Sequence, residues 1–255
     1  MIAFYLPGGL PVYAFSLLLG VGVCLGLLWA AWQAPPKHAL LVVNAGLFSL
    51  LGALLGGRLA YVLARWSYYQ MHWQEIPQFY RGGLAWVGVL AGSLLALLVY
   101  ASLVRQPAGF FLDALLPLIG LLTVSAWLAC WADGCAYGAT SSAWWALPAR
   151  NEWGVIDRRV PVQLIGALLA IMTFGMADWF KPRFKSSGQV ALLALSVLMA
   201  GMLALSFLRA DPAPAWRGLH WESWAALSLV VIFLGILLTQ EIVRRWRKQR
   251  INRAG

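Results

Sequence analysis

The chain has 255 residues, of which 62% are hydrophobic and 11% are charged, and its formal net charge is +10. A soluble domain carries about 25% charged residues, so this composition excludes an ordinary soluble protein and favours an integral membrane protein. No polar linker, internal repeat or low-complexity tract interrupts the sequence, and we predict a single integral membrane domain over residues 1–255.

Seven segments are long and apolar enough to cross a bilayer as helices, because a spanning helix needs about 20 mostly apolar residues. In chain order they are Val12–Trp32, Ala39–Leu63, Leu84–Val104, Phe111–Trp131, Val162–Phe180, Gln189–Leu208 and Ser223–Val243. Prolines punctuate three of the connections. The predicted fold class is therefore all-α, a polytopic membrane protein with about seven transmembrane helices.

The distribution of Lys and Arg orients these helices, because cytoplasmic loops are enriched in basic residues. Residues 244–255 carry six of the nineteen basic residues and form a tail that we expect to be cytoplasmic and to face anionic lipid. Seven crossings then place the N-terminus outside, together with the long, aromatic-rich loops Ala64–Gly83 and Ala132–Pro161. Because no aromatic residues alternate with the basic ones in an extended platform, we expect no nucleic acid partner.

Arg58 is the first residue with a candidate chemical role. It lies in the otherwise uncharged stretch Leu50–Leu63, where a cation costs free energy. Its guanidinium could form a bidentate pair with a phosphate, or the side chain could extend to the outer lipid headgroups. The sequence leaves both interpretations open.

Two pairs of glycines have the four-residue spacing that allows helices to approach closely. The first pair is Gly52 and Gly56, and the second is Gly88 and Gly92. Each pair lies on one face of a predicted spanning helix, so we expect the glycines to serve helix packing.

Cys130 and Cys135 lie where the fourth predicted span ends. They could form a disulfide, bind a metal or act as nucleophiles, but we favour simple packing of small residues. Their spacing is not a zinc motif, and no His lies nearby in the sequence. We therefore expect no metal site and no cofactor.

Several short motifs follow one another along the predicted helices. They are Gly56-Gly57-Arg58-Leu59-Ala60-Tyr61, Gly82-Gly83-Leu84, Cys130-Trp131-Ala132-Asp133-Gly134-Cys135-Ala136-Tyr137-Gly138, Arg159-Val160-Pro161-Val162-Gln163 and Phe207-Leu208-Arg209-Ala210-Asp211. Their order and spacing, over most of the chain, resemble those of the bacterial prolipoprotein diacylglyceryl transferases.

This resemblance implies a multi-pass enzyme of the bacterial cytoplasmic (inner) membrane. Such an enzyme transfers diacylglyceryl from phosphatidylglycerol to the lipobox cysteine of a preprolipoprotein and releases glycerol phosphate, so its partners are the phospholipid, the preprolipoprotein and the membrane. The resemblance implies catalytic roles for Arg58, Asp133 and Arg159. It implies substrate binding by Tyr61, Gly82, Gly83, Tyr137, Gln163 and Arg209. Cations at the phosphate would stabilise the charge that builds on the leaving group.

Five positions depart from the family pattern. Val87 and Val160 occupy positions where the family carries His, Trp127 and Met202 replace basic residues, and Ser206 replaces Glu. Losing several transition-state contacts lowers a rate by orders of magnitude.

Three interpretations therefore stay open at this point. The chain is an active, divergent transferase, or a catalytically inactive relative that binds lipid or a membrane partner, or an unrelated seven-helix transporter or lipid-handling protein. A transporter predicts charged groups near the midplane of several spans. The spans here are almost free of charge, which counts against the third interpretation.

Overall fold

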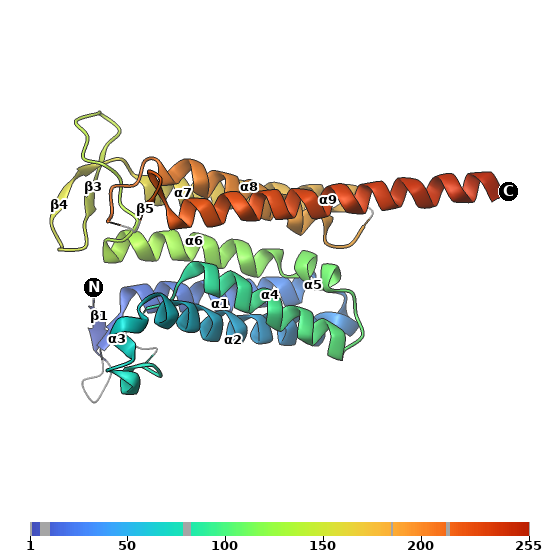
Figure 1. The fold of residues 1–255 in the computed structure, drawn as a ribbon, viewed down its shortest axis with the longest axis horizontal. Coiled ribbons are helices and arrows are strands. Elements are labelled where there is room, and N and C mark those ends of the chain that lie inside the picture. The colour runs from blue at the N-terminus through green and yellow to red at the C-terminus, as the bar shows by residue number, and fades with distance from the viewer. Residues whose placement is uncertain (1, 6–10, 79–82, 185, 213–214, 255) are drawn as a thin grey trace. The chain divides into compact units, whose positions relative to one another are not determined.

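The computed structural model of the chain describes residues 2–5, 11–78, 83–184, 186–212 and 215–254. Within this part, seven helices are long and apolar enough to cross a membrane (Figure 1). They are α1 (Ala14–Gln33), α2 (Ala39–Ala64), α4 (Trp86–Leu103), α6 (Leu116–Asp133), α7 (Val162–Phe180), α8 (Gln189–Ser206) and α9 (Trp221–Ala254). The predicted all-α, multi-pass membrane fold is thereby confirmed.

Short helices and hairpins connect the long helices. The short helices are α3 (Trp66–Tyr69), α5 (Ala108–Ala114) and the 3-10 helices Pro36–His38, Trp73–Glu75 and Lys181–Arg183. Three antiparallel hairpins pair β1 (Ile2–Tyr5) with β2 (Pro11–Tyr13), β3 (Leu147–Arg150) with β4 (Ile156–Arg159), and β5 (Ala215–Trp216) with β6 (Leu219–His220). None of these hairpins was expected from the sequence, and β2 takes up Val12 and Tyr13, the first two residues of the first predicted span, so α1 begins at Ala14 instead.

The fourth span differs from its prediction as Phe111–Trp131. The helix is interrupted at Leu115, whose φ of −90° and ψ of 3° end α5, and α6 starts afresh at Leu116. Pro117 explains the interruption, because it has no N–H to donate to the preceding turn and it disfavours helical geometry in the residue before it. The spanning helix is therefore α6, which ends at Asp133.

The chain forms two compact units, which are described separately. Unit 1 comprises Met1–Gly26 and Leu116–Gly255, and unit 2 comprises Leu27–Leu115. In unit 1, α6 packs against α7, α7 against α8 and α8 against α9. The β3–β4 and β5–β6 hairpins lie at the end of unit 1 where α7 and α9 begin, which we call the hairpin end (Figure 1). The single domain predicted over residues 1–255 stays a prediction.

In unit 2, α2 and α4 pack through the two predicted glycine pairs. A Cβ on Gly52 would overlap the backbone carbonyl of Gly92, and a Cβ on Gly88 would overlap that of Gly56. The two helix backbones are therefore in direct contact, which only residues without a side chain allow. The packing role predicted for these glycines is confirmed.

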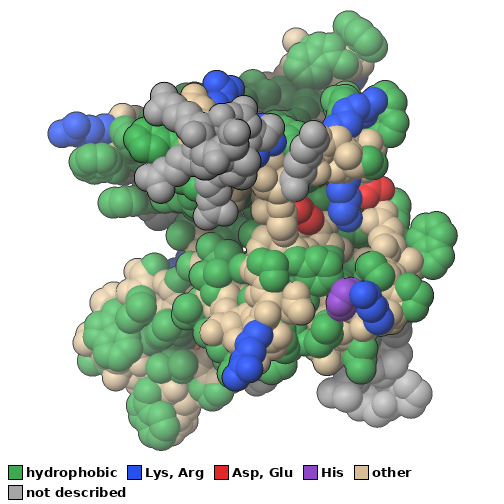
Figure 2. All heavy atoms as spheres, turned by 90° about the vertical axis from the view of Figure 1, so that its right-hand side faces the viewer, with side chains coloured by type: hydrophobic (Ala, Val, Ile, Leu, Met, Phe, Trp, Pro, Cys, Tyr) green, Lys and Arg blue, Asp and Glu red, His purple; other side chains and the backbone are tan. Residues whose placement is uncertain are grey.

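The last helix continues through the segment predicted as a basic tail. α9 has 34 residues, and at 1.5 Å per residue it is about 50 Å long, whereas the hydrocarbon core of a bilayer is about 30 Å thick. Glu241 forms ion pairs with Arg244 and Arg245 on this helix, at 2.7 and 2.9 Å. Figure 2 faces the end from which α9 projects and shows Lys and Arg side chains among many hydrophobic ones.

Candidate functional site

One extended segment, residues 137–141, organises the hairpin end. Its backbone is hydrogen-bonded to residues 158–160 on one side and to residues 208–210 on the other. On the first side Arg159 pairs with Thr140, and on the second side Arg209 pairs with Gly138, both in antiparallel register. Neighbouring extended segments lie about 4.8 Å apart, and the partners of the two arginines, Gly138 and Thr140, are two residues apart along the segment, so the two arginine backbones are about 12 Å apart. The fold thus brings together two predicted site residues that are distant in the sequence.

Arg159 is buried, with 7% of its surface exposed, but its guanidinium is held only weakly. Its Nη1 donates to the Gly138 carbonyl at 3.4 Å, and its Nη2 donates to Asp157 Oδ2 at 3.3 Å. The guanidinium carbon lies 4.8 Å from the centre of the Tyr137 ring, a cation–π contact. The buried Nε has no hydrogen-bond partner among the described residues. An anion could therefore gain a charge-assisted bond here without displacing a strong one.

Tyr137 is also buried and lies against Arg159. The carboxylate of Glu152, in the turn of the β3–β4 hairpin, acts electrostatically on its hydroxyl. Burial raises the pKa of Tyr137 to about 12, the nearby Glu152 carboxylate acts in the same direction, and the charge of Arg159 opposes both. Tyr137 is therefore a neutral donor at physiological pH.

Arg209 has strong partners, in contrast to Arg159. Its Nε and Nη2 donate to the two oxygens of Asp211 at 2.8 and 2.6 Å, and its Nη1 donates to Glu222 Oε2 at 2.6 Å. Burial alone would lower the pKa of Arg209, but the hydrogen bonds and charges of the two carboxylates raise it. Arg209 stays charged and ties residues 208–210 to the start of α9.

The cysteines form a disulfide, so the favoured interpretation of simple packing was wrong. Cys130 and Cys135 are bonded to each other, and their Cα atoms are 4.7 Å apart. Gly134, with φ of +80°, turns the chain back so that the N–H groups of Gly134 and Cys135 both donate to the Cys130 carbonyl, at 2.8 and 3.0 Å. This left-handed turn, which favours glycine, brings the two thiols together.

Gln163 and Asp133 lie on either side of this turn. Gln163 is 2% exposed, and its Nε2 donates to the Cys135 carbonyl at 3.0 Å. It therefore holds the start of α7 to the disulfide turn. Asp133 is exposed at the end of α6.

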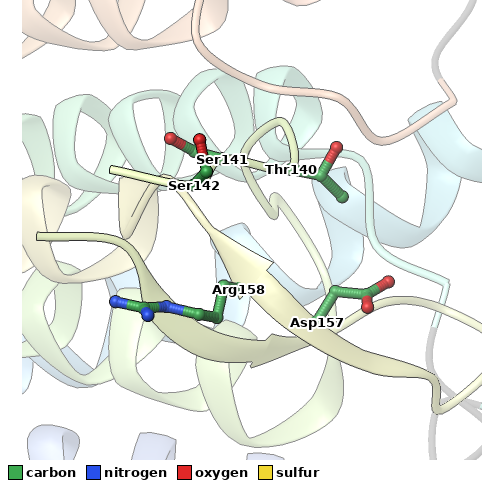
Figure 3. A pocket seen from close by; sticks show the side chains of 5 residues that line it. All are labelled: Thr140, Ser141, Ser142, Asp157 and Arg158. Atoms are coloured by element: carbon green, nitrogen blue, oxygen red, sulfur yellow. The ribbon is translucent and has the colours of Figure 1, made fainter. Parts of the chain in front are cut away.

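An open polar cavity of about 420 Å³ lies beside β4 (Figure 3). Its lining consists of Thr140, Ser141, Ser142, Asp157 and Arg158. Asp157 and Arg158 project from β4 in different directions in Figure 3, and Asp157 also contacts Arg159. Arg158 donates to backbone carbonyls of residues 143, 144 and 146, so it holds the loop beside the cavity.

Three of the departures from the family pattern fall in one apolar cluster of unit 1. Trp127, Val160 and Met202 pack with buried side chains of α7 and α8. A Cβ on Gly166 would overlap the Trp127 indole, so the ring fills the space that this glycine leaves. At these three positions the resemblance implies ionisable side chains, whereas this chain has apolar side chains that pack together.

Ser206 and Val87 are the remaining departures. The Ser223 hydroxyl of α9, which is buried, donates to Ser206 Oγ at 2.8 Å, so the position of the expected Glu carries a half-buried hydroxyl. Val87 is exposed on α4, in unit 2.

Arg58 of unit 2 is bound by backbone carbonyls. Its Nε donates to the Ile76 carbonyl at 2.8 Å, its Nη2 to that of Glu75 at 2.6 Å and its Nη1 to that of Gly83 at 3.3 Å. The residue is 5% exposed, so the alternative in which it extends to the lipid headgroups is wrong. Arg58 braces the loop between α3 and α4.

Aromatic rings complete the surroundings of Arg58. Its guanidinium carbon lies 5.8 Å from the Tyr61 ring centre and 5.5 Å from that of Tyr69. Gly83 has φ of +82°, and a Cβ there would meet both Tyr61 and Arg58. Three predicted site residues of unit 2 are thus in mutual contact. Gly82 lies outside the described residues.

Two residues of the site were missed by sequence reasoning. Glu152 acts electrostatically on Tyr137 and Glu222 bonds Arg209, yet neither belongs to a motif. Glu152 lies in a polar turn and Glu222 in the first turn of a helix, where acidic residues are common for local reasons. Only the contacts made in the fold single them out.

Comparison with known proteins agrees with this fold. Residues 1–240 match the family model described as prolipoprotein diacylglyceryl transferase. A phosphatidylglycerol–prolipoprotein diacylglyceryl transferase of Bordetella avium (strain 197N) is 30% identical over 209 residues, which cover 79% of this chain and 77% of that protein. One from Dehalococcoides mccartyi (strain ATCC BAA-2266 / KCTC 15142 / 195) is 23% identical over 251 residues, which cover 95% of this chain and 93% of that protein. The chain therefore belongs to the prolipoprotein diacylglyceryl transferase family.

Proposed function

We propose that this protein is a phosphatidylglycerol–prolipoprotein diacylglyceryl transferase. The observation that carries the proposal is the family match over residues 1–240, shared with relatives that bear this activity in their names. The substrates are phosphatidylglycerol and a preprolipoprotein with a lipobox cysteine. The products are a thioether-linked diacylglyceryl protein and glycerol phosphate.

The reaction exchanges one bond for another at a glycerol carbon. A C–S bond forms to the cysteine, the C–O bond to the phosphate breaks, and glycerol phosphate leaves with the electron pair. Negative charge therefore builds on the phosphate, and a cation placed there lowers the barrier. Arg159 supports this role, because its Nε is unpartnered within the described part of the chain and its other bonds are 3.3–3.4 Å long.

The other site residues organise the protein around Arg159. Tyr137 lies against the guanidinium, and Gln163 anchors the disulfide turn that leads to Tyr137. Arg209, with its two carboxylates, secures the opposite flank of the same segment. In unit 2, Arg58 contacts Tyr61 and Gly83. We propose catalytic roles for Arg58 and for Asp133 as well.

Two independent features support an inner-membrane protein with the hairpin end outside and the C-terminus in the cytoplasm. The disulfide lies at the hairpin end, and disulfides persist in the periplasm but not in the reducing cytoplasm. The basic end of α9 lies at the opposite end of that helix, where the positive-inside rule places the cytoplasm. Both features favour the orientation predicted from the sequence.

Purified protein in detergent, supplied with phosphatidylglycerol and a lipobox peptide, tests the activity. We expect a thioether product and release of glycerol phosphate. Arg159→Ala should lower the rate by about 100-fold or more, as loss of a charge-stabilising donor does, whereas Arg245→Ala on the far part of α9 should retain it. Absence of thioether product with the unaltered protein, together with failure to complement cells depleted of their own transferase, would refute the proposal.

A further inference from the structure

Three tryptophans are in contact where the β5–β6 hairpin meets the start of α9. The ring centre of Trp216, on β5, lies 6.1 Å from that of Trp221, and the two rings are nearly parallel. The Trp216 ring centre also lies 5.4 Å from that of Trp224, whose Nε1 donates to the Trp216 carbonyl at 3.1 Å. These contacts hold the hairpin against the first turn of α9.

Arg217 forms the turn of this hairpin together with Gly218. Both residues have positive φ, 50° and 79°, as in a type I′ turn, in which Asn and Gly are the usual residues. Arg217 is exposed, and its guanidinium carbon lies 4.7 Å from the Trp216 ring centre. The hairpin therefore presents a cation on the face of an indole ring, in a backbone conformation that residues with a side chain rarely adopt.

The polar groups of this surface are available to a ligand. Among the described residues no carboxylate pairs with Arg217, whereas Arg209 of the same unit binds two. The indole N–H groups of Trp216 and Trp221 also have no hydrogen-bond partner in the described part of the chain, and these residues are 47% and 59% exposed. We call Trp216, Arg217 and Trp221 the tryptophan–arginine patch.

The tryptophan–arginine patch lies at the boundary of a membrane span. The apolar part of α9 that is long enough to cross a bilayer begins at Trp221. A lipid bilayer therefore places the patch at the level of the headgroups, where an indole ring can contact apolar chains and donate its N–H to a polar group. A guanidinium at this depth binds the phosphate of a phospholipid.

The charge of the patch selects among phospholipids. The exposed cation attracts a headgroup with net negative charge. A zwitterionic headgroup would instead bring a second cation toward the Trp216 ring, against which the Arg217 guanidinium already lies. The patch thus fits an anionic phospholipid better than phosphatidylcholine.

A contact in the first turn of α9 links the patch to the candidate site. Glu222 follows Trp221 in the sequence, and its Oε2 accepts a hydrogen bond from Arg209 Nη1 at 2.6 Å. Arg209 in turn lies on one flank of residues 137–141, whose other flank carries Arg159. A lipid bound to the patch is therefore held at the same hairpin end as Arg159.

We propose that the tryptophan–arginine patch binds the headgroup of an anionic phospholipid and supplies phosphatidylglycerol to the transfer reaction. The phosphate accepts hydrogen bonds from the Arg217 guanidinium and the free indole N–H groups, and the acyl chains lie along α9. The binding is a property of the patch itself, whereas the supply of donor rests on the proposed function.

Lipid binding to the purified full-length protein tests the first part. Delipidated protein in detergent is titrated with phosphatidylglycerol or with phosphatidylcholine, and the bound lipids are counted by native mass spectrometry. Arg217→Asn removes the guanidinium but suits the type I′ turn, so the hairpin is retained. We expect this variant to bind phosphatidylglycerol about fivefold more weakly and phosphatidylcholine as before. Arg217→Lys, which keeps the charge, should recover part of the affinity.

The kinetics of thioether formation test the second part. Arg217→Asn should raise KM for phosphatidylglycerol about fivefold and leave kcat unchanged, because the patch holds the donor but touches no reacting atom. Arg105→Asn is the matched control, since Arg105 is also exposed, has φ of 54° and makes no ring contact with the described residues. This control should change neither the lipid affinity nor KM.

The outcomes separate this inference from the proposed function. If Arg217→Asn binds phosphatidylglycerol as tightly as the unaltered protein, or loses affinity for both lipids equally, the patch is not a site for anionic phospholipid. A weaker affinity with an unchanged KM would support the binding site and overturn the supply of donor. If the unaltered protein forms no thioether, the proposed function falls, while the titration still decides whether the patch binds lipid.

Discussion

Arg159 and Arg209 show how neighbouring residues decide what the same side chain can do. Both lie on flanks of residues 137–141. Arg209 is saturated by two carboxylates at 2.6–2.8 Å, so binding a phosphate would require those bonds to break. Arg159 has longer bonds and an unpartnered Nε in the described structure, so it can accept a phosphate at lower cost. At the scale of single residues, Arg159 is therefore the stronger candidate.

The raised pKa of Tyr137 predicts a specific loss of stability in alkali. Its pKa rises from 10.0 to about 12 in the folded protein, so its neutral form is favoured by folding. The resulting stabilisation is fully present below pH 10 and is lost as the pH rises from 10 to 12. Thermal unfolding in detergent, followed across this range, should show a decline that Tyr137→Phe reduces. Identical declines in both proteins would contradict the prediction.

The connection from α6 to β3 depends on its covalent bridge. The disulfide closes the turn that Gln163 contacts and that leads to Tyr137. Reduction would release this turn from the end of α6. The position of Tyr137 beside Arg159 therefore depends on the Cys130–Cys135 disulfide and on the hydrogen bond from Gln163.

Reduction of the disulfide should lower the stability of the protein. A loop of this short length contributes about 2 kcal/mol through the entropy of the unfolded chain. We expect Cys135→Ser, or treatment with a reductant, to lower the melting temperature in detergent and to slow thioether formation. Cys24 is a free cysteine, so Cys24→Ser should change neither quantity. An unchanged melting temperature after complete reduction would contradict the role of the bridge.

The contact between α2 and α4 depends on the absence of side chains. Gly88→Val would force its branched side chain against the Gly56 carbonyl and the Ala60 side chain. Overpacking costs about 1–3 kcal/mol, and more where backbone must move, so we expect a clear drop in melting temperature. Gly235→Val on α9, where no atom lies within 4 Å, is the matched control and should melt like the unaltered protein. Equal melting of both variants would show that the helices do not pack in this way.

At the scale of the whole molecule, the polar chemistry described for unit 1 lies at its hairpin end. The disulfide, Arg159 and Glu152 are all found there, while α9 carries its basic residues away toward its own C-terminus (Figure 1). A phospholipid and a secreted protein segment can both reach this end from the outer leaflet if the protein has the proposed orientation. In the proposed orientation, the membrane separates the hairpin end from the basic end of α9.

Labelling of intact cells tests this orientation. Trp153 is 75% exposed in the β3–β4 turn, and Trp153→Cys should react with a membrane-impermeant maleimide added outside. Arg183→Cys, at the opposite end of α7, should react only after the cells are opened. The unaltered protein, whose free Cys24 lies within α1, controls for background. The reverse pattern would show that the hairpin end faces the cytoplasm.

Much of the fold could be predicted from the sequence because lipid imposes a simple requirement. Each span must be a long apolar helix that satisfies its own backbone, so composition alone located seven of them. The fourth span was misplaced because its apolar character continues across Leu115, whereas the backbone geometry does not. The three hairpins of the described residues were missed because each strand has only two to four residues, too few to show an alternating hydrophobic pattern.

The sequence by itself determined that this protein is a seven-helix membrane protein of the transferase family, since hydrophobic length and motif order are properties of the chain. The tertiary structure decided which residues meet. It paired Cys130 with Cys135, placed Arg159 on Tyr137 and bonded Arg209 to Glu222. It also showed that Trp127, Val160 and Met202 share one apolar cluster. Such contacts depend on how turns and helix faces pack, and no local sequence pattern encodes those distances.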